Sequence, residues 1–95
     1  MKKPSVLVVD DDPATLQLIC SVLEANGVSC LAADGAAQAL ELAEVHPALG
    51  LIITDINMPQ MDGLALVKRI GGTPGRAAIP PVVFLTAYPS VDFAI

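Results

Sequence analysis

The sequence predicts an α/β domain built on a parallel sheet, with a helix connecting each strand to the next. Short apolar runs bounded by turn residues alternate with stretches whose apolar residues recur at helical spacing. Runs that are apolar on both faces are typical of parallel strands covered by helices on both sides. At 95 residues the chain is at most one domain.

The composition and charge of the chain limit its class and its partners. Its hydrophobic fraction of 54% exceeds the usual ~45 to 50%, which excludes a disordered chain. No stretch approaches the ~20 consecutive apolar residues of a membrane span, and the N-terminus does not fit a signal peptide, so we expect a cytoplasmic protein. The net charge of -5 disfavours binding to nucleic acid and favours proteins or a cation as partners.

The first strand is predicted over residues 5–10 and ends in Asp10, the first of three consecutive carboxylates with Asp11 and Asp12. Like charges about 4 Å apart repel by roughly 4 kcal/mol at an effective dielectric constant near 20. Such a cluster is costly unless a counter-charge relieves the repulsion, so the three residues need an explanation beyond the turn itself.

The first helix is predicted to follow Asp12, because Asp before Pro13 is typical of an N-cap with proline at the first helical position. It is expected to end at Asn26-Gly27, where the backbone tolerates a left-handed conformation. Capping explains Asp12 and leaves Asp10 and Asp11 unexplained. The apolar face predicted for this helix comprises Leu16, Ile19, Cys20 and Leu23.

Residues 28–32 predict a second strand, and residues 36–45 predict a helix that ends at His46-Pro47. We expect small alanines to let this helix lie close to the sheet. His46 lies in the last turn, where a favourable interaction with the helix dipole is the usual role, so we do not regard it as a metal ligand or a catalytic group. The apolar edge expected for this helix comprises Ala37, Leu40 and Ala43.

Cys20 and Cys30 fall in the first helix and the second strand of this prediction. They lack CxxC spacing and have no histidine nearby. We therefore interpret both as small buried apolar residues, with no indication of redox or zinc chemistry.

The third strand is predicted over residues 51–54 and carries Asp55 at its carboxyl end. A helix is predicted to start at Asp62-Gly63, followed by a flexible connection through residues 71–75. The fourth strand covers residues 82–85 and ends in Thr86, and residues 90–95 resemble the start of a further helix. Leu64, Val67 and Ile70 are expected to point inward from the helix after Asp62.

Parallel strands in the order 2-1-3-4 would bring the ends of the first and third strands together where the order reverses. Asp10, Asp11 and Asp55 would then converge in the crevice where open α/β sheets bind ligands. The alternative for Asp55 alone is a capping or turn role.

The segments VLVVDDDP, LIITDINMPQMDG and VVFLTA, in this order and spacing, resemble the receiver domain of two-component response regulators. The resemblance extends from Lys3 to the end of the chain. It implies a doubly wound, flavodoxin-like sheet in the order 2-1-3-4, in a single domain over residues 1–95. The family's fifth strand, with its phosphoryl-pairing lysine, and its fifth helix are absent from the sequence, so we expect an incomplete receiver domain.

The resemblance implies that Asp55 accepts a phosphoryl group from the phosphohistidine of a histidine kinase. The carboxylates of Asp11 and Asp55 and the backbone carbonyl of Asn57 would hold Mg²⁺ directly, and Asp10 would act through water. Thr86 would donate a hydrogen bond to the phosphoryl oxygens.

Further positions are assigned by the same resemblance. The Ala87 N–H would supply a second hydrogen bond to the phosphoryl group. Met58 and Tyr88 would flank the site, and Asn57 and Tyr88 would affect the rate of dephosphorylation. For Thr86 the alternative is a strand residue that caps the following helix.

Three other expectations concern how the chain works. The open edge of the fourth strand predicts a homodimer or a swapped assembly in which a second chain covers it. Without the family lysine, a docking or dimerisation module that is not phosphorylated is an alternative function. A phosphatase of the haloacid-dehalogenase type is a remote alternative, because Asp10 and Asp12 fit its pattern but the threonine arrives one residue late, at Thr15.

Overall fold

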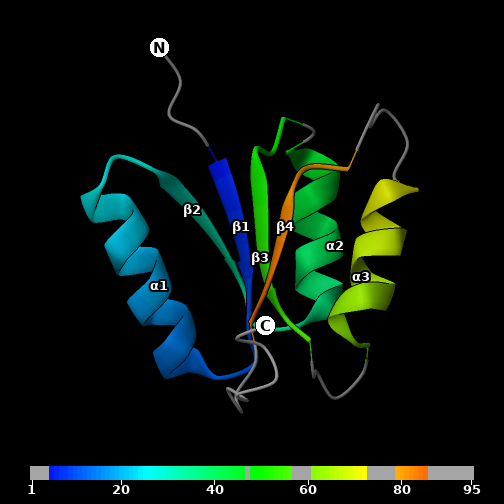
Figure 1. Cartoon of the computed structure of the whole chain (residues 1–95), viewed down its shortest axis with the longest axis horizontal. Helices are drawn as coiled ribbons and strands as arrows, with labels where there is room; N and C mark the ends of the chain where they lie inside the picture. The colour runs from blue at the N-terminus through cyan, green and yellow to red at the C-terminus, as the bar shows by residue number, and fades with distance from the viewer. Residues whose placement is uncertain (1–4, 47, 57–60, 73–78, 86–95) are drawn as a thin grey trace, which may run out of the picture.

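The computed structural model describes residues 5–46, 48–56, 61–72 and 79–85. Strands and helices alternate along these residues, and all strand pairs are parallel in the order β2-β1-β3-β4, as predicted (Figure 1). The elements are β1 (Ser5–Val9), α1 (Pro13–Ala25), β2 (Ser29–Ala33), α2 (Ala36–Val45), β3 (Leu51–Asp55), α3 (Gly63–Gly71) and β4 (Val82–Leu85).

The strand register aligns the carboxyl ends of the sheet. Val9, the last residue of β1, pairs with Ala33 on one side and with Thr54 on the other, and Asp55 pairs with Leu85. The residues that follow β1 and end β3 therefore lie at the same edge, where the strand order reverses.

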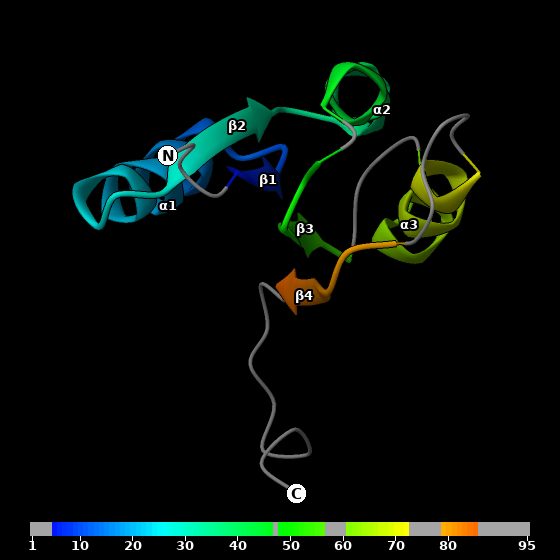
Figure 2. The same ribbon diagram turned by 90° about the horizontal axis from the view of Figure 1, so that it is seen from above.

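The helices form two layers of unequal size. Helix α1 covers one face of the sheet beside β1 and β2, whereas α2 and α3 cover the opposite face (Figure 2). The main core lies under α2 and α3, and α1 contributes no fully buried residue. The larger residues of this core with no exposed surface are Leu7, Ile52, Leu66 and Ile70.

Helix α2 packs closely through small side chains, as predicted. Ala39 and Ala43 have no exposed surface, and Ala36 is nearly as buried. The predicted apolar edge is wrong at Ala37, which is exposed, and Leu40 is only half-buried. Residues 36, 39 and 43 lie within one stripe of a helix with 3.6 residues per turn, and this stripe faces the sheet.

The predicted inward face of α3 is wrong at Leu64, which is 59% exposed, while Leu66 is fully buried. Gly63, Leu66 and Ile70 face the core, since residues 0, 3 and 7 of a helix fall within about 60° of each other. Leu64 lies outside that stripe. Val67 is half-buried at its margin.

Cys20 and Cys30 form a disulfide, which corrects the interpretation of both as separate buried apolar residues without redox chemistry. Helix α1 ends at Ala25, Gly27 turns the chain with φ of +80°, and β2 returns beneath the helix. This reversal brings the two Cα atoms to 5.4 Å, within the range that a disulfide spans. A spacing of ten residues carries no local motif, so the pairing depends on the three-dimensional crossing.

Strand β4 is one of the two edge strands of the sheet over the described residues, and β2 is the other. Its side chains are partly open to solvent, with Val83 46% and Phe84 36% exposed. The predicted homodimer or swapped assembly through this edge stays a prediction. Among the described residues, no helix is long and apolar enough to cross a membrane.

Candidate functional site

Asp10 directly follows β1 and is held at a fixed position in the crevice. Its N–H donates a hydrogen bond to the Ala33 carbonyl at 3.1 Å, which extends the pairing between β1 and β2 by one residue. Its Oδ1 accepts a hydrogen bond from the Asp12 N–H at 2.9 Å. Only 6% of the residue is exposed, so this carboxylate belongs to the floor of the site.

Asp55 is the last residue of β3 and is half-buried. The backbone after it is fixed on two sides: Ile56 N–H donates to the Leu85 carbonyl at 3.2 Å, and Gly63 N–H donates to the Ile56 carbonyl at 2.9 Å. The sheet and the start of α3 therefore set the position of Asp55 together.

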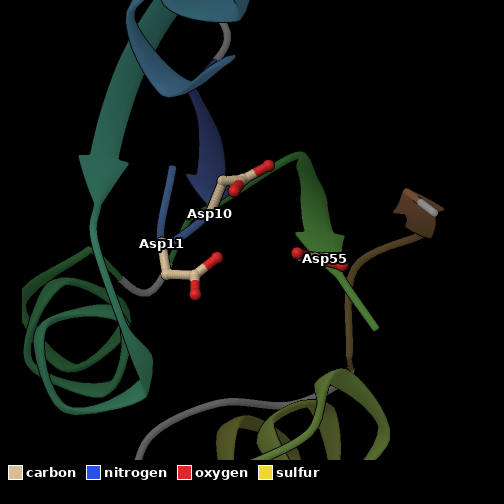
Figure 3. A group of neighbouring side chains, drawn as sticks. All are labelled: Asp10, Asp11 and Asp55. Atoms are coloured by element: carbon tan, nitrogen blue, oxygen red, sulfur yellow. The ribbon is translucent and has the colours of Figure 1, made fainter. Parts of the chain in front are cut away.

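The carboxylates of Asp10, Asp11 and Asp55 converge, as predicted (Figure 3). One oxygen from each lies within 4.8 Å of the others, which is close enough for one cation to contact all three. The three residues border an open pocket of about 360 Å³ beside the first turns of α1. The other residues that line this pocket are Asp12, Thr15, Ile19 and Leu85.

Burial is the main cause that raises the pKa of Asp10 above its ordinary value. The hydrogen bond from the Asp12 backbone opposes this rise, and the negative charges of Asp55, Asp11 and Asp12 add to it. The folded protein therefore holds a carboxylate where negative charge is disfavoured. A divalent cation would reverse that balance, and the all-oxygen ligands fit Mg²⁺.

Asp12 occupies the predicted N-cap position of α1, but its side chain does not make the standard capping hydrogen bond. Its Oδ2 instead accepts a hydrogen bond from the Thr15 hydroxyl at 2.6 Å. This hydrogen bond is the main cause that lowers the pKa of the Asp12 carboxyl. Asp12 thus joins the loop after β1 to the first turn of α1.

Three residues that line the pocket were not predicted as site residues, namely Thr15, Ile19 and Leu85. Thr15 could have been recognised by its position three residues after the N-cap, where a side chain reaches back to the capping group. Leu85 could have been placed by the register that pairs it with Asp55.

Five predicted site residues lie outside the described part of the chain, and their roles stay predictions: Asn57, Met58, Thr86, Ala87 and Tyr88.

Comparisons with known proteins agree with this geometry. Residues 6–95 match the family model of the response regulator receiver domain. The chain is 40% identical over 83 residues to an uncharacterized 14.6 kDa protein of Leptolyngbya boryana, of which it spans 62%. It is 36% identical over 96 residues to the DNA-binding transcriptional regulator NtrC of Escherichia coli, with all of this chain aligned to 19% of that protein.

A solved structure gives the same result in three dimensions. The chemotaxis protein CheY4 of Vibrio cholerae superimposes with a TM-score of 0.84 and 28% identity, over 98% of this chain and 76% of that one. The family model, the relatives and the shared fold lead to one conclusion: this chain belongs to the response regulator receiver domain family.

Proposed function

We propose that Asp55 accepts a phosphoryl group from the phosphohistidine of a histidine kinase, in a reaction that depends on Mg²⁺, and that phosphorylation changes protein–protein contacts. The observation that carries this proposal is the convergence of three carboxylates from two strand ends. The receiver family is a signalling family and not a family of catalytic enzymes. Family membership therefore favours this role over the phosphatase alternative.

Exposure favours Asp55 as the acceptor among the three acids. Asp10 is 6% exposed and its Oδ1 is already hydrogen-bonded, so a phosphoryl group carried on another protein could not reach it in line. Asp11 is exposed in the loop after β1. Asp55 is half-buried at the end of a strand, with its backbone fixed from two sides, and combines access with a defined position.

The acidic cluster would hold the cation through Asp11, Asp55 and the Asn57 carbonyl, with Asp10 acting through water. When bound, Mg²⁺ neutralises charge on the transferring phosphoryl group and on the acids around it. An Asp55 oxygen forms a bond to phosphorus as the phosphorus–nitrogen bond of the phosphohistidine breaks, and the histidine nitrogen retains the electron pair. The Thr86 hydroxyl and the Ala87 N–H would donate hydrogen bonds to the phosphoryl oxygens.

A direct test is the intact mass of the protein after incubation with acetyl phosphate and Mg²⁺. We expect the wild type to gain one phosphoryl group and Asp55→Asn to gain none. Asp34→Asn is a matched control, because Asp34 is an exposed aspartate at the end of β2 and outside the cluster, so it should label like the wild type.

The same experiment with chelator in place of Mg²⁺ should abolish labelling. Absence of any phosphoryl gain in a folded wild type with Mg²⁺ would refute the proposal and leave the unphosphorylated docking module. Equal labelling of the wild type and Asp55→Asn would mean that a residue other than Asp55 accepts the phosphoryl group.

A further inference from the structure

A disulfide joins α1 to β2 beside the acidic pocket, and its surroundings are open to small molecules. Cys20 and Cys30 are both half-buried, so neither sulfur is sealed in the core. Cys20 also lines a second hollow, of about 430 Å³, along the seam between α1 and β2. The other residues of this hollow are Pro13, Leu16, Gln17, Ser21, Glu24 and Ala32.

Helix α1 packs less deeply on the sheet than the other two helices, so the disulfide matters for its attachment. Helices α2 and α3 each place residues in the fully buried core, whereas α1 has no buried residue. Two of its residues, Leu18 and Val22, are 65% and 54% exposed. Because helices in proteins are held mainly by packing, the covalent link to β2 is a large part of what keeps α1 on the sheet.

The helix that this bond anchors also forms one wall of the acidic site. Thr15 and Ile19 line the pocket of the three converging carboxylates, and Ile19 is the neighbour of Cys20. Asp12 binds the Thr15 hydroxyl, and its own N–H binds Asp10, so a hydrogen-bonded path runs from α1 to the floor of the site. Movement of α1 would therefore change the position of Asp10 through these hydrogen bonds.

We propose that Cys20 and Cys30 are a reversible thiol–disulfide pair, and that its oxidation state controls how firmly α1, and with it the wall of the acidic pocket, is held against the sheet. In a reducing compartment persistent disulfides are rare, and those that form are usually transient or redox-sensing. The cytoplasmic location expected from the sequence would make this pair a sensor of that kind.

The chemistry balances with a small-molecule disulfide as the oxidant. The Cys20 thiolate attacks one sulfur of that disulfide, which forms a mixed disulfide and releases one small thiol. The Cys30 thiolate then attacks the Cys20 sulfur, closes the protein bond and releases the second small thiol. Two electrons pass from the cysteines to the oxidant, and the two thiol protons end on the released thiols.

The test uses the wild-type chain in buffers of glutathione and glutathione disulfide at varied ratio, followed by acid quench, alkylation and intact mass. We expect both thiols to disappear together as a monomeric disulfide forms. In the reduced form, amide hydrogen exchange over residues 13–25 should quicken on the order of tenfold or more relative to residues 63–71. The Tm should fall by roughly 10 to 20 °C.

A Cys20→Ser/Cys30→Ser variant should resemble the reduced wild type and ignore the glutathione ratio; the wild-type comparison stands without it if the variant does not fold. Two free thiols, or only glutathione adducts, in the most oxidising buffer would overturn the proposal. Equal exchange over residues 13–25 in both forms would also overturn it. None of these readouts requires phosphorylation or Mg²⁺, so the proposed function can fail or hold separately.

Discussion

Replacement of Gly63 by alanine tests whether the start of α3 positions Asp55. A Cβ at residue 63 would lie 2.6 Å from the Asp55 carbonyl oxygen, 3.2 Å from Phe84 Cε1 and 3.3 Å from Ile56 Cα. Ordinary contact begins at 3.4 Å, so the Asp55 backbone and the helix must separate by about 0.8 Å. The shortest of these contacts is with a backbone atom, which cannot move aside as a flexible side chain could.

The helix is not free to provide all of this movement. Gly63 N–H is bound to the Ile56 carbonyl at 2.9 Å, and the Asp62 carboxylate accepts the Ala65 N–H at 2.8 Å. Overpacking of this kind costs about 1 to 3 kcal/mol, and alanine returns up to about 1 kcal/mol through its higher helix propensity. We expect a net loss of about 1 to 2 kcal/mol, which corresponds to a Tm lower by roughly 4 to 16 °C.

We expect Gly63→Ala to slow phosphorylation of Asp55 more than its loss of stability alone would explain. A misplacement near 1 Å can slow a positioned reaction by about a hundredfold, so we expect acetyl phosphate to label Gly63→Ala on the order of ten to a hundred times more slowly than the wild type. Thermal unfolding followed by circular dichroism and the time course of intact mass at a temperature well below both Tm values measure the two effects separately.

Gly72→Ala is the matched control at the other end of the same helix. Its nearest neighbour would be the Arg69 carbonyl oxygen at 3.7 Å, an ordinary contact, and its backbone has a negative φ. This variant should keep the wild-type Tm and labelling rate. If Gly63→Ala also labelled at the wild-type rate, the close approach of α3 would have no part in positioning Asp55.

Two further predictions concern the acidic floor and the core. Burial raises the pKa of Asp10 above its value in the unfolded chain, which is near 3.8. In metal-free protein, the free energy of unfolding should therefore fall as the pH rises from that value through the raised pKa of the folded state, and the loss persists at higher pH. Asp10→Asn should therefore be more stable than the wild type in urea at pH 7 with chelator, with little difference at pH 3; equal stability at pH 7 would contradict this cause. Leu66→Ala should cost about 2 to 5 kcal/mol in urea unfolding, whereas Leu64→Ala should stay within about 0.5 kcal/mol, and similar losses would mean that the assigned face of α3 is wrong.

The convergence of the acids was predictable because each of two apolar runs ends directly in aspartate. Once both runs are parallel strands of one sheet, their ends share an edge, and the crossover rules leave few strand orders. Asp10, Asp11 and Asp55 could thus be assembled without coordinates. The lining residue Ile19 of α1 could not, because its place depends on where a helix on one face begins relative to that edge.

The wrong predictions have a common physical origin: they depend on how a helix is rotated about its axis and on which strand it crosses. Leu64 and Leu66 are equally apolar, so composition cannot decide which of them faces the sheet; the rotation of α3 about its axis decides it, and this rotation turns Leu66 to the core and Leu64 to solvent. The Cys20–Cys30 bond likewise depends on α1 lying directly over β2. Periodicity identifies such elements well, but it does not fix how one element is rotated over another.

Burial decreases across the α1 face of the sheet from β1 to β4, and this gradient explains why Asp10 and Asp55 have different surroundings. In the row formed by paired residues Val8, Ile53 and Val83, Val8 has no exposed surface, Ile53 is half-buried and Val83 is 46% exposed. Asp10 and Asp55 follow the same gradient, since Asp10 lies beyond β1 and Asp55 ends β3. Desolvation raises the pKa of Asp10, where it favours a counter-charge, whereas Asp55 at the end of β3 is only half-buried. The same sheet thus supplies a buried carboxylate and a half-buried one at neighbouring strand ends, which supports the proposed roles of Asp10 beside the cation and of Asp55 as the phosphoryl acceptor.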